Sequence, residues 1–110
     1  MVRATMDESQ FDKLAGAELK ALDEALEALD GLEVDSNGEV ITVGFPDGGA
    51  PMVVNSHRAA RQIWLSAEMK AAHYSWDEGT STWLDARSGE ELHARLSVVL
   101  TRKLGRAVSL

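Results

Sequence analysis

Apolar residues recur at helical spacing near both ends of the chain and alternate with polar residues in the middle. Near the start, an apolar stripe predicts an amphipathic helix built on Phe11, Leu14, Ala15, Leu22, Ala25, Leu26 and Leu29. Thr5 and Glu8 have the spacing of a capping box, in which two side chains satisfy free backbone N–H groups at a helix start. We therefore expect this helix to begin at Thr5 and to end at the stop signal Gly31.

A second apolar stripe predicts a helix near the end of the chain, formed by Leu92, Leu96, Val99, Leu100 and Leu104. Ser88 and Glu91 have capping-box spacing just ahead of it, and Gly105 is a suitable C-cap. Arg102 and Lys103 fall in the expected last turn, where the helix dipole favours positive charge.

Between the two helices, short strand-like segments are separated by turns. Asn37-Gly38 is a strong hairpin signal, and Pro46-Asp47-Gly48-Gly49 is a second turn. Because the connections are short, neighbouring strands should pair antiparallel. We expect strands at 32–35, 40–45, 52–55, 61–67, 72–77 and 82–84. Both helices can bury their stripes on one face of this sheet, so the predicted fold is an α+β, two-layer α/β sandwich forming a single domain over residues 1–110.

Alternation along the fourth strand separates a core face from an open face. If Ile63 and Leu65 point toward the helices, Gln62 and Trp64 point to the open face. Trp is a favoured anchor in protein interfaces, so we expect Trp64 to bind a partner; the alternative is that it packs over neighbouring strand residues. Asn55, at the end of the third strand, can lie near Trp64 on that face.

The fifth strand alternates in the same way. Tyr74 and Trp76 share one parity and are expected to enter the core, while the polar residues His73, Ser75 and Asp77 face outward. The histidines show no metal-ligand spacing and are interpreted as surface residues: His57, His73 and His93.

Composition excludes several classes of site. The chain has 110 residues and no cysteine, which excludes disulfides, thiolate metal sites and a cluster held by its own thiolates. A net charge of −7 disfavours nucleic acids and anionic membranes as partners. No apolar stretch approaches the roughly 20 residues of a membrane span, and the start lacks the apolar core of a signal peptide. We expect a soluble, intracellular protein.

The negative charge is concentrated in the first part of the chain. Residues 1–47 carry 12 acidic and 3 basic residues, whereas the rest carries 6 acidic and 8 basic ones. Carboxylates repeat at i, i+4 and i+7 near the end of the first helix and at alternate positions on the first strand: Asp23, Glu24, Glu27, Asp30, Glu33 and Asp35. Carboxylate oxygens suit hard cations such as Fe(III), Ca(II) or Mn(II). The alternative is a solvated surface that keeps the protein soluble.

The element order and the acidic first helix and strand resemble the frataxin family, including its bacterial CyaY members. The resemblance covers roughly Ser9 to Gly105, and its most specific stretch is Gln62-Ile63-Trp64-Leu65-Ser66. Other matching pieces are Asn37-Gly38-Glu39-Val40-Ile41-Thr42-Val43, Val53-Val54-Asn55, Tyr74-Ser75-Trp76-Asp77, Trp83 and Arg87-Ser88-Gly89-Glu90. The resemblance implies the same two-helix sandwich.

The resemblance also implies a function in iron–sulfur cluster assembly. Frataxins bind Fe(II) or Fe(III) weakly along an acidic ridge and dock on the complex of cysteine desulfurase and scaffold protein. By position, the ridge maps onto Asp23, Glu24, Glu27, Asp30, Glu33 and Asp35, with Glu8 and Asp12 as weaker candidates. The partner contacts map onto Asn55, Gln62 and Trp64.

Some positions depart from the family pattern, and these concern the partner contact more than the fold. Ser56-His57 stands where the family often has a basic residue and Gln, and His73 stands where eukaryotic members have Arg. Ala71-Ala72 replaces a common glycine pair.

Two other functions remain open from the residues alone. One is a metal-independent interaction module that uses the same carboxylates and Trp64. The other is a weak ferroxidase, although the chain has no dinuclear Glu-x-x-His pattern and no GxGxxG, P-loop or GxSxG motif. We expect a monomer, with an iron-dependent oligomer as the alternative, in a bacterial cytoplasm or, for a processed eukaryotic chain, a mitochondrial matrix.

Overall fold

The computed structural model of the chain describes residues 6–110 and contains two helices that flank six strands. The elements follow in the order α1 (Glu8–Glu27), β1 (Glu33–Ser36), β2 (Val40–Gly44), β3 (Met52–His57), β4 (Gln62–Ala67), β5 (Lys70–Asp77), β6 (Thr82–Asp85) and α2 (Leu92–Leu104). This order confirms the prediction. The strand ends lie within about two residues of the expected bounds, as is usual for assignments of element ends.

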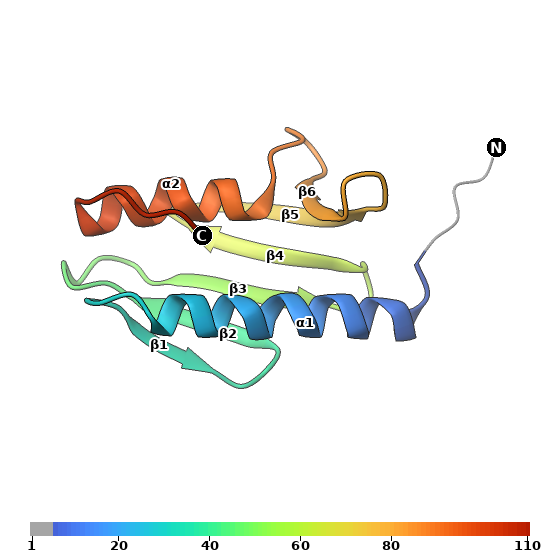
Figure 1. Cartoon of the computed structure of the whole chain (residues 1–110), viewed down its shortest axis with the longest axis horizontal. Coiled ribbons are helices and arrows are strands. Elements are labelled where there is room, and N and C mark those ends of the chain that lie inside the picture. The colour runs from blue at the N-terminus through green and yellow to red at the C-terminus, as the bar shows by residue number, and fades with distance from the viewer. Residues whose placement is uncertain (1–5) are drawn as a thin grey trace.

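The strands form one sheet in the order in which they occur in the sequence, and every neighbouring pair is antiparallel. Both helices pack on the same side of this sheet, side by side, which leaves the other face open (Figure 1). The predicted two-layer α/β sandwich is therefore confirmed. None of the described helices is long and apolar enough to cross a membrane.

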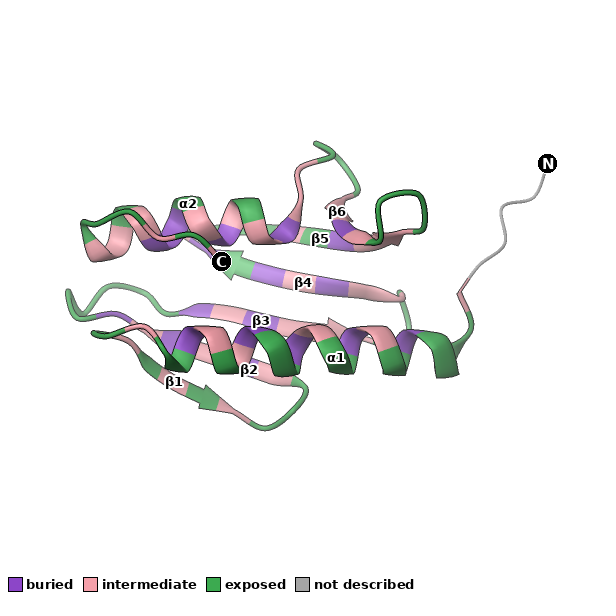
Figure 2. Ribbon diagram, viewed as in Figure 1, coloured by how far each residue is buried: buried purple, intermediate pink, exposed green. Residues whose placement is uncertain are grey.

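The core lies between the helix layer and the sheet. The helices bury their predicted stripes, and the strands bury alternate residues, as the bands of buried positions in Figure 2 show. The helical contribution is Phe11, Ala15, Leu19, Leu22, Leu26, Leu92, Leu96, Val99 and Leu100. Leu19 completes the stripe of α1, and the apolar pattern did not assign it. Each fully buried Leu, Val or Phe side chain contributes about 1.5–3 kcal/mol relative to an exposed one.

The caps of α1 differ from the prediction. Thr5 lies outside the described residues, and the N-cap is Asp7, whose carboxylate accepts a bond of 2.8 Å from the Gln10 N–H. The Gln10 side chain accepts from the Asp7 N–H in return, so the capping box starts two residues later than expected. The helix ends at Glu27, and Gly31, at φ +92°, lies in the turn that follows.

The start of α2 also differs. The N-cap is Glu91, whose carboxylate accepts from the N–H groups of His93 and Ala94. Ser88 is not the cap, because its hydroxyl accepts from the Glu90 N–H within the turn after β6. The predicted C-cap is confirmed: Gly105 adopts the left-handed conformation at φ 69°.

Beyond Gly105 the chain turns back along α2 (Figure 1). The Val108 N–H donates to Thr101 Oγ1 at 3.0 Å, and the Leu110 N–H donates to Ser97 Oγ at 3.0 Å. Val108 and Leu110 pack against the core. This final segment is therefore part of the helix layer.

Candidate functional site

The predicted carboxylates occupy the end of α1, the following turn and β1. We call this set the acidic ridge: Asp23, Glu24, Glu27, Asp30, Glu33 and Asp35. Its members are exposed, apart from Asp23, which is half-buried. The Oδ1 atom of Asp23 is buried and has no hydrogen-bond partner in the described part of the chain. The other five carboxylates of the ridge are therefore more accessible from solvent than Asp23.

The acidic ridge is not one helix face. The i, i+4, i+7 spacing of Asp23, Glu27 and Asp30 would place all three on one face of a helix, but α1 ends at Glu27 and Asp30 lies in the turn, so this placement is wrong. The turn is held by the C-terminal segment: Arg106 donates to the Asp30 carbonyl at 2.9 Å. On β1, Glu33 lies opposite Gly44 of β2 and Asp35 lies opposite Thr42 in the strand register.

On the edge strand β1 the side chains alternate between the two faces of the sheet. Val34 packs against the core, so Glu33 and Asp35 project to the opposite, open face. The carboxylates of α1 belong to the helix layer. The acidic ridge therefore runs from the helix layer around the β1 edge, which lies beside the end of α1 (Figure 1).

The charge of the acidic ridge is not neutralised by the fold. None of its carboxylates forms an ion pair with a described residue, from Met6 to Leu110. The weaker candidates behave differently, since Arg58 lies 3.1 Å from Glu8 and 3.0 Å from Asp12. The helix thus presents free negative charge only toward its C-terminal end. Such a one-sign surface attracts cations and basic partners.

The acidic ridge does not form a metal cage. Among residues 6–110, no group of three or more His, Asp or Glu side chains is positioned to hold a metal ion. A tight site for a hard cation needs about six converging oxygen ligands. A cation at the ridge would therefore be held by the surface charge and by single carboxylates, and it would remain largely hydrated.

The second predicted surface lies at the centre of the open sheet face. In the sheet register Asn55, Trp64 and His73 are direct neighbours across β3, β4 and β5. We call this region, together with Gln62 and His57, the Trp64 face. Alternation along β4 is confirmed, because Ile63 and Leu65 are buried on the helix side. The structure thus brings together all three predicted partner-binding residues.

The Trp64 indole is enclosed by two imidazoles. The His57 ring stacks on the Trp64 indole at 3.9 Å between ring centroids and 10° between planes, and the His73 ring stacks on it at 4.2 Å and 13°. Trp64 is consequently half-buried, and this stacking matches the stated alternative, in which Trp64 packs over residues of the neighbouring strands. The Ala60 N–H donates to His57 Nδ1 at 3.2 Å, which fixes this imidazole in place.

Polar groups on this face are also connected to one another. Trp64 Nε1 donates to Gln62 Oε1 at 3.0 Å, and Gln62 Nε2 donates to Ser75 Oγ at 3.3 Å. Asn55 Nδ2 donates to the Ser56 carbonyl at 3.3 Å. The side chains of the Trp64 face are therefore held in fixed positions by stacking and hydrogen bonds.

Sequence reasoning missed the contribution of His57 and His73. Both were interpreted as separate surface residues, although His73 was placed on the outward parity of its strand. The available signal was register: pairing β4 with β5 through the short turn sets His73 opposite Trp64, and His57 lies diagonally across on β3. Stacked aromatic neighbours follow from that placement.

The fold and its surfaces define a small α/β-sandwich protein with an uncompensated acidic edge and an aromatic centre on its open face. A family model described as a frataxin-like domain matches residues 4–106. The chain belongs to the frataxin family.

Curated relatives support this assignment over nearly the whole chain. The chain is 36% identical over 107 residues to an iron-sulfur cluster assembly protein CyaY from Dechloromonas aromatica (strain RCB), covering 96% of this chain and 99% of the relative. It is 31% identical over 110 residues to the protein of the same name from Cupriavidus pinatubonensis, covering 96% of each.

Solved structures show the same fold. The frataxin of Psychromonas ingrahamii superposes with a TM-score of 0.83 at 27% identity, covering 94% of this chain and 97% of the other. A trimeric frataxin from Saccharomyces cerevisiae gives a TM-score of 0.63 at 21% identity, covering 96% of this chain and 85% of the other. The yeast protein supports the fold alone.

Proposed function

We propose that this protein is an accessory protein of iron–sulfur cluster assembly that binds iron weakly on the acidic ridge and docks on a cysteine desulfurase and scaffold complex. The observation that carries the proposal is the uncompensated charge of the acidic ridge. Its carboxylates lack ion-pair partners among residues 6–110, while those at the start of α1 have them. Two relatives of nearly equal length are named iron-sulfur cluster assembly proteins.

Iron is the cargo in this proposal. Carboxylate oxygens are suitable ligands for Fe(II) and Fe(III), and an open surface allows the ion to leave again. Because the ridge does not converge on one point, binding should be weak and distributed over several carboxylates. Those properties suit transient delivery or sensing of iron rather than storage.

Partner binding would use both surfaces. The acidic ridge would attract a basic patch on the cysteine desulfurase and raise the association rate at low salt. The Trp64 face would supply the contact with the scaffold protein through Asn55, Gln62 and Trp64, since preorganised aromatic residues are typical interface anchors. We propose a bacterial cytoplasm as the location, which agrees with the bacterial source of both relatives.

An amide NMR titration with anaerobic Fe(II), followed by Fe(III), tests the iron proposal. Paramagnetic broadening should begin at Asp23 through Asp35 and spare the start of α1. The variant Glu24→Gln, Glu27→Gln, Asp35→Asn should lose most of this broadening. The control variant Glu8→Gln, Asp12→Asn, Glu78→Gln has the same net charge and should keep it. Equal broadening in both variants, or none at the ridge, would exclude the site.

A metal-independent interaction module is the second candidate function. The absence of converging ligands among residues 6–110 favours it, because a surface of single carboxylates serves a basic protein as well as it serves an ion. In this case the ridge variant would lose binding to the desulfurase and scaffold complex, while wild-type ridge signals would stay unchanged at millimolar iron. We do not propose an enzymatic function.

A further inference from the structure

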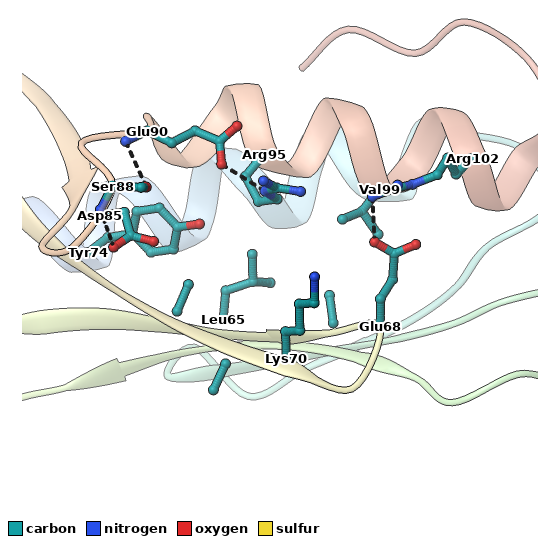
Figure 3. A pocket seen from close by; sticks show the side chains of 13 residues that line it. Leu65, Glu68, Lys70, Tyr74, Asp85, Ser88, Glu90, Arg95, Val99 and Arg102 are labelled. Atoms are coloured by element: carbon teal, nitrogen blue, oxygen red, sulfur yellow. Dashed lines mark hydrogen bonds and ion pairs between the residues drawn. The ribbon is translucent and has the colours of Figure 1, made fainter.

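A cleft lies between α2 and the hairpin that joins β4 to β5 (Figure 3), and no residue of the acidic ridge or of the Trp64 face lines it. Its volume is about 700 Å³. Side chains from β4, β5 and α2 give it an apolar interior. Charged side chains surround this interior and come from the turn between β4 and β5, from β5, from the end of β6 and the turn after it, and from α2. The volume is typical of pockets that hold small organic molecules.

The cleft exists because the sheet and helix layers do not match in length there. β6 pairs only with Tyr74–Asp77 of β5, so the first part of β5 has β4 on one side and no strand on the other. Ala67 and Ala72 are small residues on the core side of the sheet at this point. α2 therefore covers a part of the sheet whose side chains do not fill the space beneath it.

Tyr74 supplies a buried polar atom at the inner end of the cleft. Its side chain is 0% exposed, and its hydroxyl has no hydrogen-bond partner among the described residues. In Figure 3 the phenol oxygen points into the cleft, on the side of Arg95. A buried hydroxyl without a partner costs free energy, so a ligand that accepts from it would recover that cost.

The raised pKa of Tyr74 keeps its hydroxyl in the protonated form, which is a hydrogen-bond donor. Burial raises its pKa to about 12, and the negative charges of Asp85 and Glu90 add to this effect. The phenol therefore stays protonated at neutral pH and can donate to a ligand oxygen.

Within residues 6–110, the charges around the cleft leave one cationic side chain without an ion pair. Arg102 pairs with Glu68 at 2.7 Å, and Arg95 pairs with Glu90 at 2.8 Å. Asp85 accepts from the N–H groups of the turn that follows it. Lys70 lines the cleft and forms no ion pair with any residue from Met6 to Leu110. The acidic side chains are thus occupied, and Lys70 is available to an anion.

We propose that this cleft binds a small aromatic carboxylate that carries a hydrogen-bond acceptor at the end opposite its carboxyl group. Lys70 attracts the carboxylate, and Tyr74 donates to the acceptor at the inner end. The ring lies on Leu65, Ala72 and Val99. The cleft lies on the helix side of the sheet, whereas the Trp64 face is on the other side, so this inference stands independently of the proposed function.

Titration of the full chain with 4-hydroxybenzoate, followed by amide NMR, tests the inference. Saturable shifts should be confined to residues of the cleft on β4, β5 and α2, with a Kd on the order of 1–10 mM for so small a ligand. 4-Hydroxybenzamide is the neutral control, and inorganic phosphate is the control for charge alone. Either control compound binding as tightly as the acid, or the absence of saturable shifts, would overturn the inference.

Two variants separate the roles of the two groups. Lys70→Gln should weaken 4-hydroxybenzoate by about tenfold, and the matched surface variant Lys13→Gln should leave it unchanged. Tyr74→Phe should weaken 4-hydroxybenzoate more than it weakens benzoate, which lacks the inner oxygen. If Lys13→Gln has as large an effect as Lys70→Gln, or if Tyr74→Phe affects both acids equally, the assigned contacts are wrong. Thermal unfolding of each variant verifies that it is folded.

Discussion

The ion pair between His93 and Glu18 provides a pH-dependent link between the two helices. His93 Nε2 donates to Glu18 Oε1 at 2.8 Å, and the side chains are 35% and 13% exposed, respectively. The hydrogen bond to Glu18 raises the pKa of His93 above its ordinary value, against the opposing effect of burial. The nearby charge of Glu91 raises it further. The folded protein therefore binds a proton at His93 more tightly than the unfolded chain does.

The sign of the pH dependence follows from this raised pKa. Stabilisation by the protonated imidazole is complete below the unfolded pKa of about 6.5 and is lost as the pH rises through the higher folded pKa. A hydrogen bond to a charged group contributes about 1.5–3 kcal/mol, whereas an exposed ion pair contributes about 0–1 kcal/mol. Since His93 is partly exposed, we expect a contribution of about 1 kcal/mol, equivalent to about 4 °C in Tm for a chain of this size.

The perturbation is His93→Gln, which keeps a hydrogen-bonding side chain and removes the titratable charge. Urea unfolding followed by circular dichroism, at pH values from 6 to 9, gives the free energy of unfolding of both proteins. The variant should be less stable than the wild type by about 1 kcal/mol at pH 6, and the difference should nearly vanish at pH 9. All other titrating groups are present in both proteins, so their contributions cancel in the difference between the two free energies of unfolding.

Glu18→Gln and the double variant complete a thermodynamic cycle. At pH 6 the two single substitutions should be non-additive, because each removes the same interaction. A difference between wild type and His93→Gln that stays constant from pH 6 to pH 9, or grows toward pH 9, would refute the reasoning.

Three further predictions concern stability and are measured by the same urea unfolding. Leu22→Ala, at a fully buried position of α1, should lower the free energy of unfolding by about 2–5 kcal/mol, and a smaller loss would mean that the core closes around the cavity. Removing Val108–Leu110 should cost about 1–3 kcal/mol, since it removes two apolar contacts with the core and three hydrogen bonds with α2; unchanged stability would contradict this packing. Tyr74→Phe should leave stability unchanged or raise it by about 1 kcal/mol, because its buried hydroxyl has no hydrogen-bond partner among residues 6–110; a loss of similar size would show that the hydroxyl is bonded.

The elements and their buried faces could be predicted because both depend on local periodicity. A helix that packs on a sheet buries every third or fourth residue, and a strand buries every second one, so positions such as Ile63 and Leu65 are specified by spacing alone. Caps were predicted less well. Thr and Asp are both residue types that favour the N-cap position. Thr5 is followed three positions later by Glu8, and Asp7 by Gln10, so both have the spacing of a capping box. Spacing does not choose between them.

The candidate surfaces could be predicted as residue types but not as environments. The open face of β4 follows from alternation, whereas the enclosure of Trp64 depends on contacts with β3 and β5. Similarly, Arg58 reaches Asp12 across 46 positions of sequence, which no local pattern contains. Long-range pairs of this kind require the register of the sheet and the placement of α1 above it.

The distribution of ion pairs changes the meaning of the acidic pattern. By count alone, the negative charge extends along all of α1, and every carboxylate on it is an equal candidate for binding. In the folded chain Arg58 forms ion pairs with Glu8 and Asp12, and His93 pairs with Glu18. These ion pairs lie in the first two-thirds of the helix. The end of α1 and the adjoining strand β1 receive no such partner among residues 6–110. The fold thereby leaves the unpaired carboxylates of α1 and β1 together along one edge of the sheet, beside the end of α1.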